Sequence, residues 1–177
     1  MENLAGKVMQ DRNWFEQLGL KIPGFKGYLD KELRRETDKI LREFLAKRVD
    51  ELRGRLDPVM RDLVDNGGLM VVNEVDRVKK AMEKLVSRLR FATYGYSGLF
   101  DAVKVGEEEL NRLYMFDMAL TERIDGLEQA VGEIGAAVKD HQQLKAATRK
   151  ALDMAREFDE HFSNRERLIC EPTGTEM

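Results

Sequence analysis

The sequence has few of the residues that interrupt helices, cross-link a chain or bind metals. Among 177 residues there are three prolines, one cysteine and two histidines. A lone cysteine, Cys170, excludes a disulfide within the chain, and with two histidines it gives too few ligands for a zinc site. No run approaches the roughly 18 apolar residues of a membrane span. Residues 1–20 also lack the pattern of a signal peptide, so we expect a cytoplasmic protein.

Charged residues, in contrast, are abundant. They make up 36% of the chain, and together with frequent Leu and Ala they predict an all-α fold. Residues 21–100 carry 18 basic and 13 acidic side chains, whereas residues 101–177 carry 10 and 17. A basic surface for nucleic acid or anionic lipid is one explanation. Because both signs alternate within each region, neutralisation between packed parts explains the pattern better, and we expect no nucleic-acid partner.

Apolar residues that recur at three- and four-residue steps predict a helical hairpin. The first stripe covers residues 33–63, with a kink or restart where Asp57 is suited to an N-cap and Pro58 to a first helical turn. An Asn-Gly-Gly turn at residues 66–68 ends this helix. The stripe continues in a second helix over residues 73–89. We therefore predict an elongated antiparallel coiled-coil hairpin.

A third helix is predicted to begin at the three glutamates of residues 107–109. Its heptad seam consists of Leu113, Leu120, Ile124, Leu127, Val131, Ile134 and Val138. The pattern loosens but continues to Phe158, which predicts one helix of roughly 75 Å. The alternative is a break near Gly132 to Gly135 that folds the last part back as a fourth helix. The bundle thus has three or four helices, and a long third helix with an uncovered seam predicts a homo-oligomer.

These patterns divide the chain into three parts. Residues 1–27 are predicted to form a short helix and a turn, because one proline and two glycines in residues 22–28 cannot continue a helix. Residues 28–168 are predicted to form the bundle. Residues 169–177 are expected to be a disordered tail.

Aromatic residues gather in the connector between the second and third helices and near the N-terminus. The candidate partner-binding residues are Tyr94, Tyr96, Leu99 and Phe100 in the connector, and Trp14 and Phe25 near the N-terminus. Exposed aromatic anchors dominate protein interfaces, which favours a binding site for a protein partner. The alternative is that the connector residues plug one end of the bundle and that the N-terminal aromatic residues dock beside them.

Residues with catalytic or metal-binding chemistry are sparse. The Glu-x-x-His pattern of di-iron helical enzymes is absent; His141 is interpreted as a polar seam position and His161 as a surface partner of Glu157. Cations in residues 34–55 are of the type that grips a dicarboxylate in small helical mutases. They alternate with acids such as Asp38, as on a solvated helix face. The sequence therefore predicts no metal, no cofactor and no enzymatic activity.

Two segments resemble a family of uncharacterised prokaryotic helical proteins. They are Ile22-Pro-Gly-Phe-Lys-Gly-Tyr28, followed by Lys31-Glu-Leu-Arg-Arg35, and Tyr94-Gly-Tyr-Ser-Gly-Leu-Phe-Asp-Ala-Val-Lys104. The resemblance implies a helical protein, but it implies no particular activity and no site residue.

These features of the sequence predict one function and one alternative. The leading interpretation is a helical interaction or scaffold protein that presents the aromatic connector to a protein partner or to a second copy. In shape alone, the predicted hairpin also resembles coiled-coil proteins that assemble on bacterial membranes under envelope stress. The alternative is therefore a peripheral membrane or envelope-stress protein.

Overall fold

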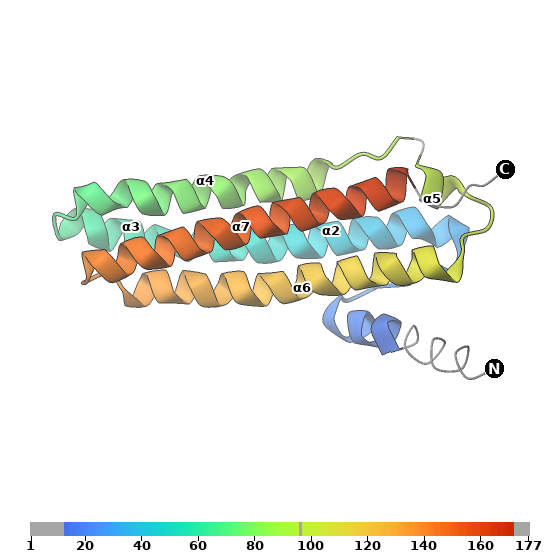
Figure 1. Cartoon of the computed structure of the whole chain (residues 1–177). Coiled ribbons are helices and arrows are strands. Elements are labelled where there is room, and N and C mark those ends of the chain that lie inside the picture. Colours follow the sequence, from blue (N-terminus) through green and yellow to red (C-terminus); the bar gives the residue numbers. More distant parts are fainter. Residues whose placement is uncertain (1–12, 96, 172–177) are drawn as a thin grey trace. The chain divides into compact units, whose positions relative to one another are not determined.

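The structure is a computed structural model that describes residues 13–95 and 97–171. Within these residues there is no strand, so the predicted all-α helical bundle is confirmed. The helices are α2 (Lys31–Gly54), α3 (Leu56–Asp65), α4 (Leu69–Phe91), α5 (Gly98–Asp101), α6 (Glu107–Ala136) and α7 (His141–Cys170), and residues 13–21 are also helical (Figure 1). In the described part of the chain, no helix is both long and apolar enough to cross a membrane.

The chain divides into two compact units. Unit 1 gathers Met1–Phe44, Ala92–Leu120 and His161–Met177, and unit 2 gathers Leu45–Phe91 and Thr121–Glu160. Helices α2, α6 and α7 contribute residues to both units, whereas α3 and α4 belong to unit 2 and α5 belongs to unit 1.

The core of unit 2 is built from the apolar stripes that the sequence predicts. Its buried members include Leu45, Val49, Leu52, Leu56, Val59 and Leu63 from α2 and α3, Val75, Val78, Met82, Leu85 and Leu89 from α4, and Ile124, Leu127, Val131 and Ile134 from α6. Helix α3 packs against α4. A Cβ atom on Gly126 would lie 3.0 Å from Cε of Met154, so this glycine permits the close approach of α6 and α7.

The first helix restarts earlier than predicted. Arg55 separates α2 from α3, so Pro58 is the third residue of α3, where a backbone N–H has no partner within the helix. The prediction that Asp57 caps this helix is wrong, because N-cap Arg55 precedes it and Asp57 instead pairs with Lys79 of α4. Helix α4 begins at Leu69, four residues before the predicted start.

The prediction of one long third helix is also wrong. Helix α6 ends at Ala136 and α7 begins at His141, so the fourth-helix alternative is correct. The turn lies just beyond Gly132 and Gly135 because Asp140 caps α7: its Oδ1 accepts hydrogen bonds from the backbone N–H groups of the second and third residues of α7, at 3.0 and 3.1 Å. Because the seam of α6 is buried, it no longer favours a homo-oligomer, which stays a prediction.

We expect opposite effects from two glycine-to-alanine substitutions in unit 2. Gly67 has a φ of 73° and Gly132 lies inside α6, and no atom lies within 4 Å of a Cβ built on either residue. Gly67→Ala should lower the free energy of unfolding by about 1–2 kcal/mol through backbone strain. Gly132→Ala should raise it by about 0.5–1 kcal/mol. Urea denaturation followed by circular dichroism measures both, and a stabilised Gly67→Ala variant would contradict the turn geometry.

Candidate functional site

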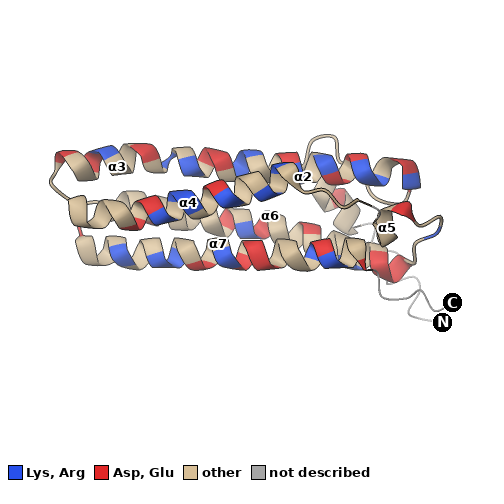
Figure 2. Ribbon diagram, turned by 90° about the horizontal axis from the view of Figure 1, so that it is seen from above, with Lys and Arg blue, Asp and Glu red and all other residues tan. Residues whose placement is uncertain are grey.

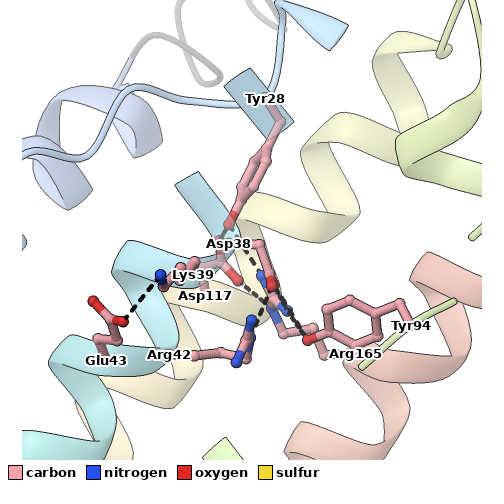
Figure 3. Close-up of polar contacts among 8 residues, drawn as sticks. All are labelled: Tyr28, Asp38, Lys39, Arg42, Glu43, Tyr94, Asp117 and Arg165. Atoms are coloured by element: carbon pink, nitrogen blue, oxygen red, sulfur yellow. Dashed lines mark hydrogen bonds and ion pairs between the residues drawn. The ribbon is translucent and has the colours of Figure 1, made fainter. Parts of the chain in front are cut away.

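Unit 1 contains a set of charged and phenolic side chains in its core, which we term the buried polar cluster. Its members are Tyr28, Asp38, Arg42, Tyr94, Asp117 and Arg165 (Figure 3). Arg165, Asp117 and Tyr28 are each 0% exposed, and Asp38 is 1% exposed. Charged side chains are rarely buried to this degree unless they are paired, so their contacts decide what the cluster does.

Arg165 of α7 is the centre of the buried polar cluster. Its Nε donates to Oδ1 of Asp117 at 2.5 Å, and its Nη1 donates to Oδ1 of Asp38 at 2.6 Å. Nη2 donates to the hydroxyl of Tyr28 at 3.0 Å, and Nη1 also donates to the hydroxyl of Tyr94 at 3.2 Å. One guanidinium group therefore joins side chains from α2, α6, the N-terminal turn and the connector (Figure 3).

The other members complete the hydrogen bonding of the two carboxylates. The hydroxyl of Tyr28 donates to Oδ2 of Asp117 at 2.7 Å. Arg42 Nε donates to Oδ2 of Asp38 at 2.8 Å, and the hydroxyl of Tyr94 donates to Oδ1 of Asp38 at 3.2 Å. Two arginines and two aspartates cancel in formal charge, so the cluster is electrically balanced and its polar groups bond one another.

Burial and neighbouring charges together shift the pKa values of Asp117, Tyr28 and Arg165. Burial raises the pKa of the Asp117 carboxyl, although the adjacent Arg165 opposes this effect. Burial also raises the pKa of the Tyr28 phenol, and the charge of Asp117 raises it further. Burial alone would lower the pKa of Arg165, but the nearby carboxylates, led by Asp117, hold it above its ordinary value. The phenols therefore act as neutral hydrogen-bonding groups and Arg165 stays charged.

A second pair of arginines fixes the connector to α2. Arg34, which is 3% exposed, donates from Nη1 to the carbonyl oxygens of Leu99 at 3.2 Å and Ala102 at 2.8 Å. Arg35 donates from Nη2 to both carboxylate oxygens of Asp101, at 2.9 and 3.0 Å. The interpretation of this stretch of α2 as a solvated helix face is therefore wrong for the buried Arg34 and Asp38, which act inside unit 1.

The structure places the predicted partner-binding residues mostly inside unit 1. Leu99 and Phe100 are 1% and 2% exposed, and Phe25 is 8% exposed. Tyr94 and Trp14 are half-buried. Tyr96 lies outside the described residues. The prediction that Leu99, Phe100 and Phe25 form an exposed anchor is therefore wrong, because their side chains are buried.

These aromatic rings pack on one another. Phe100 stacks on Tyr28 with ring centroids 6.2 Å apart, and it meets Tyr94 edge-on at 5.7 Å. Phe25 also meets Tyr28 edge-on, at 5.7 Å. A Cβ on Gly27 would lie 2.8 Å from the ring of Phe15, so this close packing requires glycine. The connector and the N-terminal turn therefore form a joint aromatic core, as the alternative of a plug predicts.

The two histidines lie in different environments. His141 is the first residue of α7 and is exposed, so its interpretation as a seam position is wrong. His161 is half-buried, and its ring lies 5.0 Å from the ring of Phe116. Beside it is a surface hollow of about 280 Å³, which we term the α6–α7 groove. It is lined by Arg112, Met115, Phe116, Ala119 and His161, and all five belong to unit 1.

No model of a protein family, no curated protein and no solved structure matches the chain. The resemblance of residues 22–35 and 94–104 to helical prokaryotic proteins therefore stays a prediction.

We expect the two phenols of the buried polar cluster to differ in their contributions to stability. Tyr28→Phe leaves a buried carboxylate and a buried guanidinium each without one partner, so the free energy of unfolding should fall by about 1–3 kcal/mol. Tyr94→Phe removes two longer hydrogen bonds, each 3.2 Å, from a half-buried residue, so the loss should be about 0.5–1 kcal/mol. Urea denaturation of both variants checks this order, and a larger loss for Tyr94→Phe would contradict it.

Proposed function

We propose that this protein is a non-enzymatic helical interaction protein that binds a helix of a partner protein in the α6–α7 groove. The observation that carries the proposal is the apolar surface of Met115, Phe116 and Ala119 on α6 beside His161 of α7. Met115 is 55% exposed. Grooves of this kind accept the apolar face of an amphipathic helix, and methionine and aromatic residues are enriched at such contacts.

The size of the groove favours a short helical segment as its occupant. Five side chains line it, whereas a stable dimer of standard size uses roughly 20 to 30 residues on each side. One or two apolar side chains of a partner helix fill a volume of about 280 Å³. The complex is therefore expected to be transient. Binding of a second copy of the chain is the alternative that the experiment below distinguishes.

The contacts inside unit 1 indicate that the charged side chains of the buried polar cluster stabilise the fold. Arg165 donates hydrogen bonds to Asp38 and Asp117, and the hydroxyl of Tyr28 donates to Asp117 in the core. The buried Phe100 makes the connector part of this core. We therefore propose that unit 1 is a rigid support for the groove, and that protein binding uses the exposed face of α6 and not the aromatic rings of the connector.

The test compares two exposed methionines. A photo-cross-linking amino acid at position 115, introduced in the native host, identifies the protein that contacts the groove. Purified partner is then titrated against the native chain, Met115→Glu and Met70→Glu; Met70 is 90% exposed but lies on α4 in unit 2. We expect Met115→Glu to raise Kd on the order of tenfold or more, because it places a charge in an apolar contact, and Met70→Glu to leave it unchanged.

Two results change this proposal. Equal affinities of the partner for the native chain and the Met115→Glu variant would exclude the α6–α7 groove as the binding site. Sedimentation of the native chain as a concentration-dependent dimer, which Met115→Glu dissociates and Met70→Glu does not, would make a second copy the occupant.

Peripheral membrane binding is the second candidate and rests on different side chains of unit 1. Leu20 and Leu29 are 88% and 80% exposed, and Lys21, Lys26 and Lys31 lie close to them in the sequence. Exposed leucines flanked by lysines suit the surface of an anionic bilayer. Sedimentation with anionic liposomes at low salt tests this candidate. A native chain that stays in the supernatant removes it, and binding lost in a Leu20→Glu, Leu29→Glu variant supports it.

A further inference from the structure

Unit 2 has a concave surface between α4 and α7 that carries an excess of positive charge. We term it the α4–α7 hollow; its volume is about 430 Å³. Its charged lining residues are Glu74 and Arg77 of α4 and Lys145, Arg149, Asp153 and Arg156 of α7. Four cations face two carboxylates, so the hollow has a formal charge of +2. Figure 2 shows the corresponding basic bands on the first half of α7.

The acids in the hollow leave most of its cationic groups accessible. Arg77 lies 3.5 Å from Glu74, and Arg156 lies 3.2 Å from Asp153. Both contacts join residues three positions apart on one helix, and the arginine side chains are 67% and 73% exposed. Contacts of this type stabilise a helix by only about 0.2–0.5 kcal/mol. Water or a ligand can therefore compete for both guanidinium groups.

The two remaining cations of the hollow are Lys145 and Arg149 of α7. Within residues 13–95 and 97–171, the side chains of Lys145 and Arg149 make no hydrogen bond or ion pair. The next residue, Lys150, differs: it pairs with Glu133 of α6 at 2.7 Å. Helix α7 thus directs Lys150 toward α6 and leaves Lys145 and Arg149 in the hollow.

The spacing of the cations indicates the chemistry of a ligand. Lys145 and Arg149 are one helical turn apart, about 6 Å along the axis, and Arg156 lies about 10 Å further on. Arg77 faces them from α4. Arginine and lysine are the usual ligands of phosphate oxygens. Because the cations extend along the hollow, a ligand with several negative groups in a row matches them better than a single anion.

We propose that the α4–α7 hollow binds a ligand that carries two or more adjacent phosphate groups. The volume of the hollow lies in the range of small-molecule sites. The ligand chemistry has two sources, a soluble polyphosphorylated molecule or the phosphorylated headgroup of a lipid. The site lies in unit 2 and is independent of the α6–α7 groove of unit 1, so either proposal can fail without the other.

Titration calorimetry of the full chain with tripolyphosphate at about 50 mM NaCl tests the site, since low ionic strength preserves surface attractions. The variant Lys145→Gln, Arg149→Gln is expected to raise Kd on the order of tenfold or more. The control variant Lys47→Gln, Arg61→Gln removes one exposed lysine and one exposed arginine elsewhere in unit 2. It should change Kd by less than about threefold. All four side chains are exposed, and circular dichroism verifies that each variant folds.

Further arms of the experiment distinguish the outcomes. Asp153→Asn should tighten tripolyphosphate binding, because it frees Arg156 from its acidic neighbour. If the ligand is a lipid headgroup, the native chain should sediment with vesicles that contain phosphatidylinositol bisphosphate, and added tripolyphosphate should release the chain from them. Tripolyphosphate binding without vesicle binding identifies a soluble ligand. No binding of either probe, or equal losses in the two double variants, would overturn the proposal.

Discussion

Replacing Arg165 with methionine is expected to lower the free energy of unfolding by about 3–5 kcal/mol. Arg165 is fully buried and donates hydrogen bonds to Asp38, Asp117 and both tyrosines of the buried polar cluster. Methionine fills much of the same volume but leaves two buried carboxylates without their shared cation. The loss therefore reflects the uncompensated charges of these carboxylates rather than a cavity. Urea denaturation followed by circular dichroism measures it.

Two further variants separate charge from shape. Arg167→Met changes an exposed arginine on the same helix, and we expect its effect to stay within about 0.5 kcal/mol. A triple variant that adds Asp38→Asn and Asp117→Asn to Arg165→Met removes the stranded charges and should recover part of the loss. A triple variant that is less stable than Arg165→Met alone would show that the carboxylates are not the cause.

The stability loss of Arg165→Met should also depend on pH. Burial already raises the pKa of Asp117, and loss of the neighbouring cation removes the influence that opposes this rise. A carboxyl whose pKa is higher in the folded state stabilises the protein below its unfolded pKa, ordinarily 3.8, and this contribution is lost as the pH rises through the folded value. The deficit relative to the native chain should therefore be smaller near pH 5 than near pH 8. Asp117→Asn in the same background should flatten this dependence.

The second large effect is expected from Phe100→Ala, which should cost about 3–5 kcal/mol of unfolding free energy. Phe100 is 2% exposed, and its ring packs against those of Tyr28 and Tyr94. The guanidinium of Arg35 also lies 6.0 Å from its centre. Truncation removes these contacts and opens a cavity that the clamped connector cannot fill by collapse.

Phe91 provides the matched control at the other end of the connector. It is the last residue of α4 and is 77% exposed, so Phe91→Ala should change stability by less than about 0.5 kcal/mol. Similar small effects of the two substitutions would mean that Phe100 contributes little to the core and would restore the connector as a candidate binding surface. Thermal unfolding of the two variants side by side decides between these cases.

The sequence predicts the helical architecture well because apolar spacing directly reports burial. The stripe from Leu45 to Leu63 is buried as the three- and four-residue steps require. The end of α6 is missed because the apolar pattern continues to Phe158, and the alternative break near Gly132 to Gly135 lies before the true end at Ala136. Gly132 and Gly135 cost only about 1 kcal/mol each and remain helical. The stronger signal was Asp140 with Gln143 three positions later, which is the pattern of a capping box.

The buried polar cluster was harder to predict, since pattern reasoning assigns charged residues to the surface. Asp117 lies between Leu113 and Leu120 on the seam of α6, and Arg165 lies in phase with the buried Phe162 and Ile169 on α7. A charged residue at an otherwise apolar position on each of two helices is the sequence signal for a buried ion pair. Asp38 gives the same signal on α2, since it lies three and seven residues before the buried Leu41 and Leu45, but only the tertiary fold brings it to Arg165, 127 residues away.

The assignment of segments to the two units has a consequence for synthesis on the ribosome. All of unit 2 has been made once residue 160 is added, whereas unit 1 still lacks its segment from His161 onward. Asp117 is therefore synthesised 48 residues before Arg165, the arginine that neutralises it. Since the chain emerges from its N-terminus at about 5–20 residues per second, unit 1 is the last part that can close. A chain released after residue 160 should thus resist protease within residues 45–91 and 121–160 while residues 13–44 remain cleavable.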